Sequence, residues 1–473
     1  MSGEGKARAI YLLDPKAYGP ETIAVTFAKT SRSPLSFQQI ADELTAAATA
    51  QFHEKWVVGY GHASVAEHAV LHLAFENVSR LAVECLQSNR LASFTEKSTR
   101  YQQWDSDGFC CPAELDGEPL LEAYQTTIAR LFKLYAALIQ PAIAHLEQEN
   151  PGMEGRKLRS TAIDSVRYLL PSAALANVGM TANARVLAHA LRKMLSHPLH
   201  EVRSMGDEAL RVAREEAPTL VRYVEQVPFM ETSRAFQRTS VGEMDPLPAT
   251  SLERVALLQY DPDAEDSVLA AMLFAQHRES ASAIQNHVQR LNQQEKRALF
   301  AGWMNGRGAH DALPRETEMA VYTFDLVMDQ GAYYEFKRHR MMTQIPQPLT
   351  ANLGYEVPLL IEAIGAGDRY RRAMDHAGDA YRRLERRNPH IAAYLVPNGY
   401  RRRVLIRTNL RQLAHFCELR STEKAHYAIR EIAIRMFEAV RQVHPSLAAM
   451  IRVPEALDAE ELVSASFVRS RPD

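Results

Sequence analysis

A polar loop in the first half of the chain gathers residue types that bind phosphate. Its hydroxyl, acidic and basic residues include Ser93, Thr95, Glu96, Ser98, Arg100 and Tyr101. A guanidinium binds two phosphate oxygens in a planar fork, and hydroxyls can donate to the remaining oxygens. The loop therefore favours a phosphate monoester as ligand, although a Ser- and Thr-rich connecting loop would have the same composition.

A basic triplet in the second half, Arg338-His339-Arg340, ends a predicted helix. Positive side chains at a helix C-terminus interact favourably with the peptide dipoles, so a solvated helix end would carry the same residues. On its own the triplet is compatible with an anion site and with an ordinary helix end.

The elements that must position these groups occur twice. An extended apolar segment followed by a helix is predicted over 69–90 and again over 319–340, an offset of 250 residues. Downstream, 171–191 and 397–417 share a Pro, an Asn-x-Arg and a His at the same offsets. Such regular self-similarity predicts two copies of one structural unit.

The chain is long enough for these two copies to be separate domains. At 473 residues it exceeds the ~250 to 300 at which single cores stop growing. We expect a first copy over 1–224, a linker rich in Pro, Ser and Thr over 225–252, and a second copy over 253–473. Helices alternating with a few strands predict an α+β fold, each copy a small sheet flanked by long helices.

Composition narrows the class of protein. An apolar fraction of 46%, a charged fraction of 24% and a net charge of -2 are typical of soluble globular chains. No apolar run reaches the ~20 residues of a membrane span, and the opening residues lack the build of a secretory signal. The four cysteines form no CxxC pair and fit free thiols in a reducing compartment, so we expect a cytoplasmic protein with no membrane partner.

Together these features resemble the flavin-dependent thymidylate synthase family. Its hallmark is Arg-His-Arg running into S-x-N-E-x-S-x-R-Y, preceded by G-H-x-S/T-x-x-E-H. The first copy matches in register at Gly61, His62, Ser64, Glu67, His68, Ser93, Glu96, Ser98, Arg100 and Tyr101. It departs at the triplet, which is Ser88-Asn89-Arg90.

The second copy retains the complementary part of this hallmark. It keeps the triplet at 338–340 and the earlier acid as Glu318. Leu313 replaces the histidine, and the loop over 341–355 lacks the Glu, Ser and Arg-Tyr positions.

The family's C-terminal pattern is divided in the same way. The first copy has Arg167 before Leu170-Pro171, but Lys193 and Met194 fall where the helical Arg belongs. The second copy has Ala393 at the first Arg position and keeps Arg420. The Asn-x-Arg residues are Asn183 and Arg185 in the first copy and Asn409 and Arg411 in the second.

The resemblance implies a homotetramer with sites between subunits, so a fused chain should form a homodimer that acts as a pseudo-tetramer. In the composite pocket we expect, Glu96, Ser98, Arg100 and Arg167 of the first copy face Arg338 and Arg420 of the second. The reciprocal pocket would be inactive.

The implied reaction is reductive methylation of dUMP to dTMP. A nicotinamide cofactor, NADPH, reduces bound FAD, and methylenetetrahydrofolate supplies the carbon. The FAD-binding residues carried over are Arg338, His339, Arg340, His62, Ser64, Glu67, Asn183 and Arg185, with Asn409, Arg411 and His415 as second-copy equivalents.

Nucleotide contacts are carried over to the loop and to two further arginines. Ser98 and Arg100, next to Glu96 and Tyr101, would bind the phosphate. Arg167 and Arg420 would anchor or polarise the pyrimidine nucleotide. Ser98 has no activating base beside it in sequence, so we interpret it as a ligand contact and not as a nucleophile.

One substitution bears on substrate and activity. Family members carry Gln three residues before the triplet, whereas this chain has Cys85 and Glu335 there. A carboxylate cannot donate as an amide does, and it repels an anionic nucleotide. The alternative is therefore a catalytically inactive or altered-specificity paralogue that binds flavin or a pyrimidine nucleotide.

Two other classes of protein are weaker hypotheses. A metal-dependent hydrolase would use His62, His68 and His72, or His310-Asp311, but no HExxH or CxxC signature is present and we expect no metal. Nucleic-acid binding through the basic residues 401–407 conflicts with the near-neutral net charge, and solvated helix faces explain the wider basic segment 351–450, which includes them, as well.

Overall fold

The computed structural model describes residues 8–100, 102–242, 244, 251–454 and 467–468. The chain forms two compact units, and each is described by itself. The first unit contains residues Met1–Lys97, Pro112–Glu114 and Leu175–Asp245. The second contains Ser98–Cys111, Leu115–Ala174 and Pro246–Asp473, so part of the first copy packs with the second.

The first unit is built on a three-stranded antiparallel sheet. Its strands are β1 (Val70–Ser79), β2 (Ala92–Glu96) and β3 (Leu175–Asn183), in the order β1-β3-β2. Residues on β1 and β3 alternate between buried and exposed along much of their length, as expected for a sheet with one covered face. Helices α4 (Arg80–Gln87) and α7 (Ala184–Leu195) follow β1 and β3 directly.

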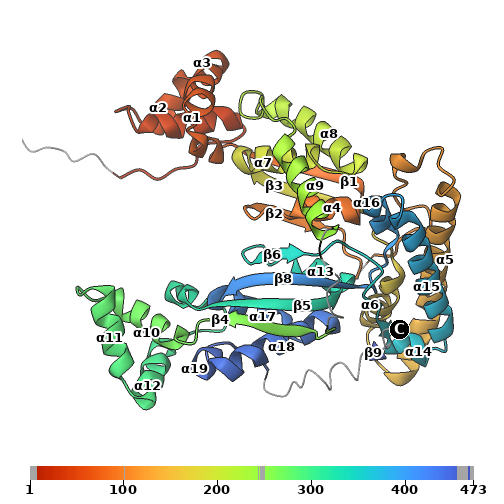
Figure 1. Cartoon of the computed structure of the whole chain (residues 1–473). Helices are drawn as coiled ribbons and strands as arrows, with labels where there is room; N and C mark the ends of the chain where they lie inside the picture. Colours follow the sequence, from red (N-terminus) through yellow and green to blue (C-terminus); the bar gives the residue numbers. More distant parts are fainter. Residues whose placement is uncertain (1–7, 101, 243, 245–250, 455–466, 469–473) are drawn as a thin grey trace, which may run out of the picture. The chain divides into compact units, whose positions relative to one another are not determined.

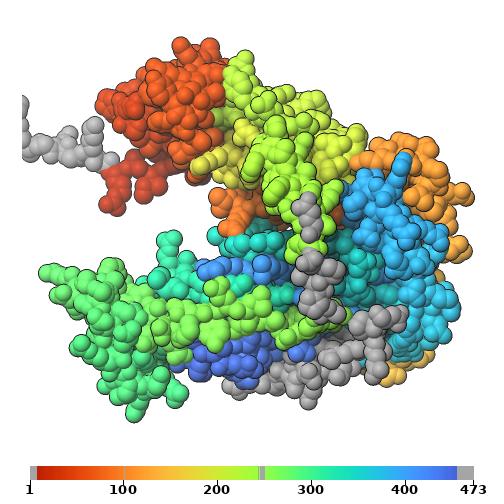
Figure 2. Space-filling model, viewed as in Figure 1, coloured from red at the N-terminus to blue at the C-terminus, as the bar shows by residue number. Residues whose placement is uncertain are grey.

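Helix α8 (His200–Glu216) packs on α7 through a close contact. A Cβ on Gly206 would lie 2.9 Å from the Cβ of Met194, so only glycine allows this approach. The remaining elements are α1 (Pro20–Thr30), α2 (Phe37–Glu43), α3 (Ala46–Phe52), the π-helix η1 (His53–Gly59), the 3-10 helix η2 (Ala63–Glu67) and α9 (Pro228–Gly242). Helices α1 to α3 form a separate lobe of this unit (Figures 1 and 2).

The second unit repeats this arrangement with one more strand. Its sheet has the order β4-β5-β8-β6, and its neighbours are antiparallel. The strands are β4 (Val255–Tyr260), β5 (Val321–Asp329), β6 (Thr343–Pro346) and β8 (Arg401–Asn409). Helix α13 (Gln330–Phe336) follows β5 and α17 (Leu410–Arg420) follows β8, as α4 and α7 follow β1 and β3 in the first unit.

One face of this sheet is covered by helices, as Figure 1 shows. Helix α18 (Tyr427–Val443) contacts β4, β5, α13 and α17. Every residue of α13 is buried, so the groups at its two ends are held in fixed positions.

Long helices of both copies pack together inside the second unit. Helix α5 (Leu121–Glu149) lies along α15 (Gly367–Glu385), and α6 (Gly155–Val166) contacts α14 (Leu359–Ala363). Two equivalent turns then pair: the 3-10 helices η4 (Arg167–Leu169) and η6 (Ala393–Leu395) each lead to a proline, and Pro171 forms an antiparallel bridge with Pro397. Residues 167–171 and 393–397 are therefore structural equivalents, as their sequences predicted.

The smaller elements of the second unit complete its surface. Helices α10 (Ala264–Phe274), α11 (Ala281–Arg290) and α12 (Gln293–Met304) form a lobe at one end of the sheet (Figure 2). The others are η5 (Arg315–Met319), β7 (Val357–Pro358), α16 (Pro389–Ala392), α19 (Pro445–Ala448) and β9 (Phe467–Val468). Within the described parts of the chain, no helix is both long and apolar enough to cross a membrane.

The α+β fold with two repeated sheet-and-helix units is confirmed. Within the expected linker, 228–242 forms α9, a helix without buried residues. The copy boundaries at 224 and 253 stay a prediction about the repeat, because the compact units group the segments differently.

Candidate functional site

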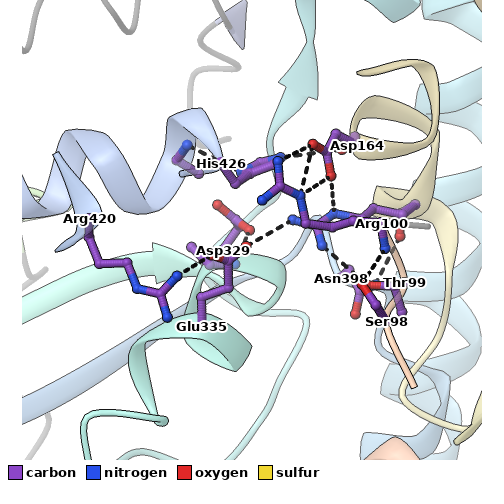
Figure 3. Close-up of polar contacts among 12 residues, drawn as sticks. Ser98, Thr99, Arg100, Asp164, Asp329, Glu335, Asn398, Arg420 and His426 are labelled. Atoms are coloured by element: carbon purple, nitrogen blue, oxygen red, sulfur yellow. Dashed lines mark hydrogen bonds and ion pairs between the residues drawn. The ribbon is translucent and has the colours of Figure 1, made fainter. Parts of the chain in front are cut away.

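The second unit brings arginines of both copies into one cluster of alternating charge. Arg100 donates to Asp164 from Nε, at 3.0 Å, and from Nη2, at 2.8 Å. Asp164 Oδ1 lies 3.5 Å from Arg167 Nε, and Arg167 Nη2 lies 3.5 Å from Glu335 Oε1. Glu335 Oε2 accepts from Arg420 Nη1 at 3.0 Å. We call Arg100, Asp164, Arg167, Glu335 and Arg420 the arginine cluster (Figure 3).

Four different segments position this cluster. Arg100 follows β2 in an irregular segment, while Asp164 lies near the end of α6 and Arg167 begins η4 one helical turn later. Glu335 lies near the end of α13, and Arg420 ends α17. Because Asp164 and Arg167 are spaced i,i+3 on one helical stretch, they lie on the same face.

Arg167 is the most buried arginine of the cluster, with 4% of its surface exposed. Its Nη1 donates to Thr99 Oγ1 at 3.1 Å, and its carbonyl oxygen accepts from Asn398 Nδ2 at 2.9 Å. Among the described residues, its Nε and Nη2 have no hydrogen-bond partner, and neither has Glu335 Oε1. These atoms have ion-pair contacts at 3.5 Å but no hydrogen bond, so this point of the cluster has hydrogen-bonding capacity for a polar ligand.

Both carboxylates lie between positive charges. Burial raises the pKa of Glu335, but the charges of Arg167 and Arg420 outweigh burial and leave its pKa below the ordinary value. Burial lowers the pKa of Arg100, but its hydrogen bonds to Asp164 raise it overall. Glu335 and Arg100 are therefore both charged at neutral pH.

The triplet lies directly beside this cluster. Arg338 is exposed, Arg340 is half-buried and His339 is buried. His339 Nε2 accepts from Arg420 Nε at 3.2 Å, and its ring packs edge-on against Phe416. Burial and the charge of Arg420 lower the pKa of His339 to about 3, so its ring is neutral. Within the triplet, the charged side chain of Arg338 is therefore exposed to solvent, whereas His339 is hydrogen-bonded to Arg420.

The first unit has different chemistry at the equivalent position. Lys193 on α7 donates to Ser88 Oγ at 2.5 Å and to Asn89 Oδ1 at 3.1 Å. Lys193 thus contacts Asn89 as Arg420 contacts His339, so of the two residues at the helical Arg position it is Lys193 that takes the place of Arg420. Burial lowers the pKa of Lys193 and raises that of neighbouring Cys85.

Three of the predicted flavin residues, together with Glu318, form matching ion pairs in the two units. Arg185 Nη1 lies 2.5 Å from Glu67 Oε1 in the first, and Arg411 Nη1 lies 2.8 Å from Glu318 Oε1 in the second. Asn183 and Asn409 cap α7 and α17, each accepting a backbone N–H at 2.9 Å. These Asn-x-Arg motifs therefore have a visible structural role in both copies.

His62 and Ser64 line a pocket of the first unit with a volume of about 650 Å³. Phe27, Phe52 and Trp56 form part of its walls, and Trp56 stacks on Tyr60, outside the lining, with ring centroids 5.0 Å apart. Lys29 and Arg32 supply positive charge, with the Arg32 guanidinium 4.8 Å from the Trp56 ring centroid. A planar aromatic ligand carrying negative charge would fit these walls.

The remaining predicted residues lie as follows. Ser98 Oγ accepts from the backbone N–H of Arg100 at 3.2 Å, which fixes the start of that segment. Glu96 belongs to the first unit, where it accepts from Gln87 at 3.0 Å and lies 3.6 Å from Arg80. His415 is exposed, with its ring centroid 5.7 Å from that of His339. Tyr101 lies outside the described residues.

Sequence reasoning missed Asp164, Thr99, Asn398 and His426. His426 is buried, and its Nε2 lies 3.3 Å from the carbonyl oxygen of Asp164. The only available signal was Asp164 itself, an acid in an otherwise apolar helix end three residues before Arg167.

The residues of the weaker hypotheses have other roles. His72 Nδ1 lies 2.8 Å from Thr181 Oγ1, and the His68 ring packs against Phe27. In the parts of the chain that are described, no cluster of three or more His, Cys, Asp or Glu could hold a metal. Arg401 and Arg402 lie on strand β8, are buried, and bond to Glu356 and Gln347, so the expectation of a solvated helix face there is wrong.

Comparison with known proteins agrees with the two-copy arrangement. The family described as Thymidylate synthase complementing protein matches residues 12–219 and 256–446. The chain belongs to this family. Its two matched regions support a tandem of two diverged flavin-dependent thymidylate synthase copies.

Relatives fall into two groups by length. A UPF0159 protein of Thermoplasma acidophilum is 29% identical over 86% of this chain and 89% of its own length. A UPF0159 protein of Chlamydia muridarum is 30% identical over 87% of this chain and 82% of its own. A flavin-dependent thymidylate synthase of Clostridium tetani is 28% identical over 43% of this chain and 82% of its own length. The long relatives thus share the tandem length, and the short one corresponds to about one copy.

Proposed function

We propose that this protein is a flavin-dependent enzyme that methylates a pyrimidine nucleotide of the dUMP type, with NADPH and methylenetetrahydrofolate as co-substrates. The observation that carries this proposal is the arginine cluster, in which Arg100 and Arg167 of the first copy meet Arg420 of the second. Neither copy alone has all three arginines. The family membership supports the same class of reaction.

The chain's own residues bind and orient in this proposal. Ser98 and Arg100 hold the nucleotide phosphate, and Arg167 with Arg420 anchors the nucleotide at its phosphate or at a pyrimidine carbonyl. FAD, when bound, supplies the hydride that completes the methyl group, and the carbon comes from methylenetetrahydrofolate. The described residues need provide no nucleophile, in keeping with Ser98 bonding to backbone.

Flavin is assigned to the residues of each unit that fit an aromatic anion. In the second unit these are Arg338, His339 and Arg340, with exposed Arg338 available for a phosphate, together with Asn409 at the end of β8 and Arg411 and His415 on α17. In the first unit they are His62, Ser64, Glu67, Asn183 and Arg185, of which the first two line the aromatic pocket.

We further propose that only one of the two possible kinds of nucleotide site is competent. In the first unit, Lys193, Ser88 and Asn89 satisfy one another where the second unit has Arg420 and the triplet. A flavin phosphate would find no guanidinium pair there. The homodimer would then hold one competent site per chain.

The visible spectrum of the purified protein, recorded before and after adding dUMP, tests the proposal. A bound oxidised flavin whose bands shift with dUMP, together with dTMP formation in the presence of NADPH and methylenetetrahydrofolate, is the expected result. Protein that never binds flavin would contradict it.

One observation favours a second candidate, an altered-specificity or inactive paralogue. Glu335 already neutralises part of the positive charge of Arg167 and Arg420. A yellow protein that responds to a pyrimidine nucleotide but makes no dTMP would support this candidate.

A further inference from the structure

Glu335 lies where an incoming anion would be bound. Its carboxylate is 3.0 Å from Arg420 Nη1 and 3.5 Å from Arg167 Nη2, so it contacts the two arginines that a phosphate or a polarised carbonyl would otherwise contact. It is 7% exposed and is therefore shielded from water. Figure 3 shows Glu335 facing Arg420 in this cluster.

We propose that Glu335 is a specificity-determining residue that acts as an internal counter-ion and limits how much a phosphate dianion contributes to ligand binding. This inference rests on the proposed function, because it concerns the same site. It predicts that the site selects its ligand mainly through the pyrimidine and only weakly through the 5′-phosphate.

The charge balance of the cluster supports this inference. Three guanidinium groups are matched by two carboxylates, Asp164 and Glu335, in one chain of direct contacts. A phosphate monoester carries close to two negative charges at neutral pH. It would have to approach Glu335 or displace it, and like charges repel strongly where water is excluded.

The two carboxylates have different positions in the cluster. Asp164 binds Arg100 through a bidentate contact and is anchored by its own helix, so it orients Arg100. Glu335 makes one hydrogen bond, and its Oε1 has no hydrogen-bond partner among the described residues. Glu335 is therefore the carboxylate whose removal should free positive charge without releasing Arg100.

The test compares three ligands, inorganic phosphate, dUMP and deoxyuridine, on the full-length wild-type protein and on Glu335→Gln by calorimetry. Gln keeps the shape and can still accept from Arg420, but it has no charge. We expect the affinity for phosphate and for dUMP to rise about tenfold or more in Glu335→Gln, and the affinity for deoxyuridine to change less than about twofold. Glu335→Asp should retain the weak phosphate binding.

Glu362→Gln is the matched control, since Glu362 also pairs with an arginine, Arg371, outside the cluster. It should leave all three affinities unchanged. If Glu335→Gln does not fold, the wild-type protein alone still tests the inference. It should bind dUMP less than about tenfold more tightly than deoxyuridine.

The outcomes separate this inference from the proposed function. Equal phosphate affinity in wild type and Glu335→Gln would overturn the inference, and so would equal gains for dUMP and deoxyuridine. A rise in phosphate affinity without any pyrimidine binding would support the role of Glu335 and refute the proposed function.

Discussion

At the scale of residues, the central feature is that each buried arginine of the cluster has a carboxylate partner. Transfer of a guanidinium from water costs several kcal/mol unless a counter-charge repays it. Asp164 and Glu335 supply that counter-charge and keep the arginines fixed before any ligand arrives. Preorganisation of this kind favours catalysis, because little reorientation is needed when a ligand binds.

Arg338 and Ser98 should affect different ligands. Arg338→Ala should lower flavin occupancy about tenfold, since it removes a charge-assisted contact, and should alter dUMP affinity little. Ser98→Ala should weaken dUMP binding by a few-fold and leave flavin in place. Flavin absorbance after gel filtration and calorimetry with dUMP measure the two effects.

Arg382→Ala provides a control for these variants, because Arg382 is an exposed arginine on α15 that pairs with Asp379. If Arg338→Ala and Ser98→Ala change neither ligand, the assignment of roles is wrong.

His339 should make stability depend on pH. The pKa of His339 is lowered from 6.5 to about 3 by burial and nearby arginines. Between these values the unfolded chain binds a proton that the folded chain excludes, so this residue costs stability as pH falls below 6.5. The loss is at most about 1.4 kcal/mol per pH unit.

His339→Gln removes this titration. Melting temperatures at pH 7.5 and 5.5 should differ less in the variant than in the wild type. An identical pH dependence in both proteins would show that His339 does not titrate as its surroundings require.

The cluster residues differ in how far the sequence could reveal them. Arg100, Arg167 and Arg420 were predicted from motifs, because each motif fixes its own residue. Thr99 occupies an unspecified position of the loop motif, and Asp164 on α6 and His426 at the start of α18 belong to no motif, so their contacts with the arginines come only from tertiary packing. Polar partners brought in by packing leave little trace in local sequence.

At the scale of elements, helix caps hold the site in place. Asp329 ends β5 and caps α13, where its Oδ1 accepts from Ala332 N at 2.8 Å. The next turns of the same helix carry Glu335 and lead to the triplet. A change in this cap would therefore shift α13 and, with it, Glu335 in the arginine cluster.

Asp329→Ala should destabilise the protein by about 1 to 2 kcal/mol, because it leaves a buried N–H without its acceptor. Asp329→Asn keeps an acceptor and should cost less than half as much. Urea midpoints at constant pH measure both, and equal losses would exclude the capping explanation.

Asp329→Asn should also change the response to pH. Burial raises the pKa of Asp329 from 3.8 to about 7, so the folded state binds its proton more tightly than the unfolded state. Wild-type stability therefore declines through this residue as pH rises from about 4 to 7. The variant should gain stability relative to wild type over that range.

Most elements around the site were predictable because their patterns are strong. The strand-then-helix pairs at 69–90 and 319–340 appeared as expected, since apolar alternation and caps agree there. The π-helix η1 and the pairing of 171 with 397 were not predicted. The π-helix has no local signature, and the bridge joins residues far apart in sequence.

At the scale of the whole molecule, the two units carry different side chains at equivalent positions. The second unit contains an arginine cluster assembled from both copies, whereas the first contains a lysine satisfied by Ser88 and Asn89. We therefore expect saturation at one dUMP per chain and not two. Calorimetric stoichiometry with the intact protein checks this, and a value of two would refute this expectation.

The oligomeric state belongs to the same scale and stays a prediction. Light scattering should give twice the mass of one chain if the fused protein dimerises. A monomer that retains full flavin and nucleotide binding would rule out the pseudo-tetramer.

The packing of residues 115–174 with residues 246–473 has a consequence for the evolution of the gene as well as for folding. A gene cut between the two repeats would encode two fragments, and the downstream product would lack α5, α6 and Arg167, which complete its own interior. Once the second copy depends on helices of the first copy in this way, it can no longer fold alone. Substitutions in α5 and α15 are then expected to accumulate in step.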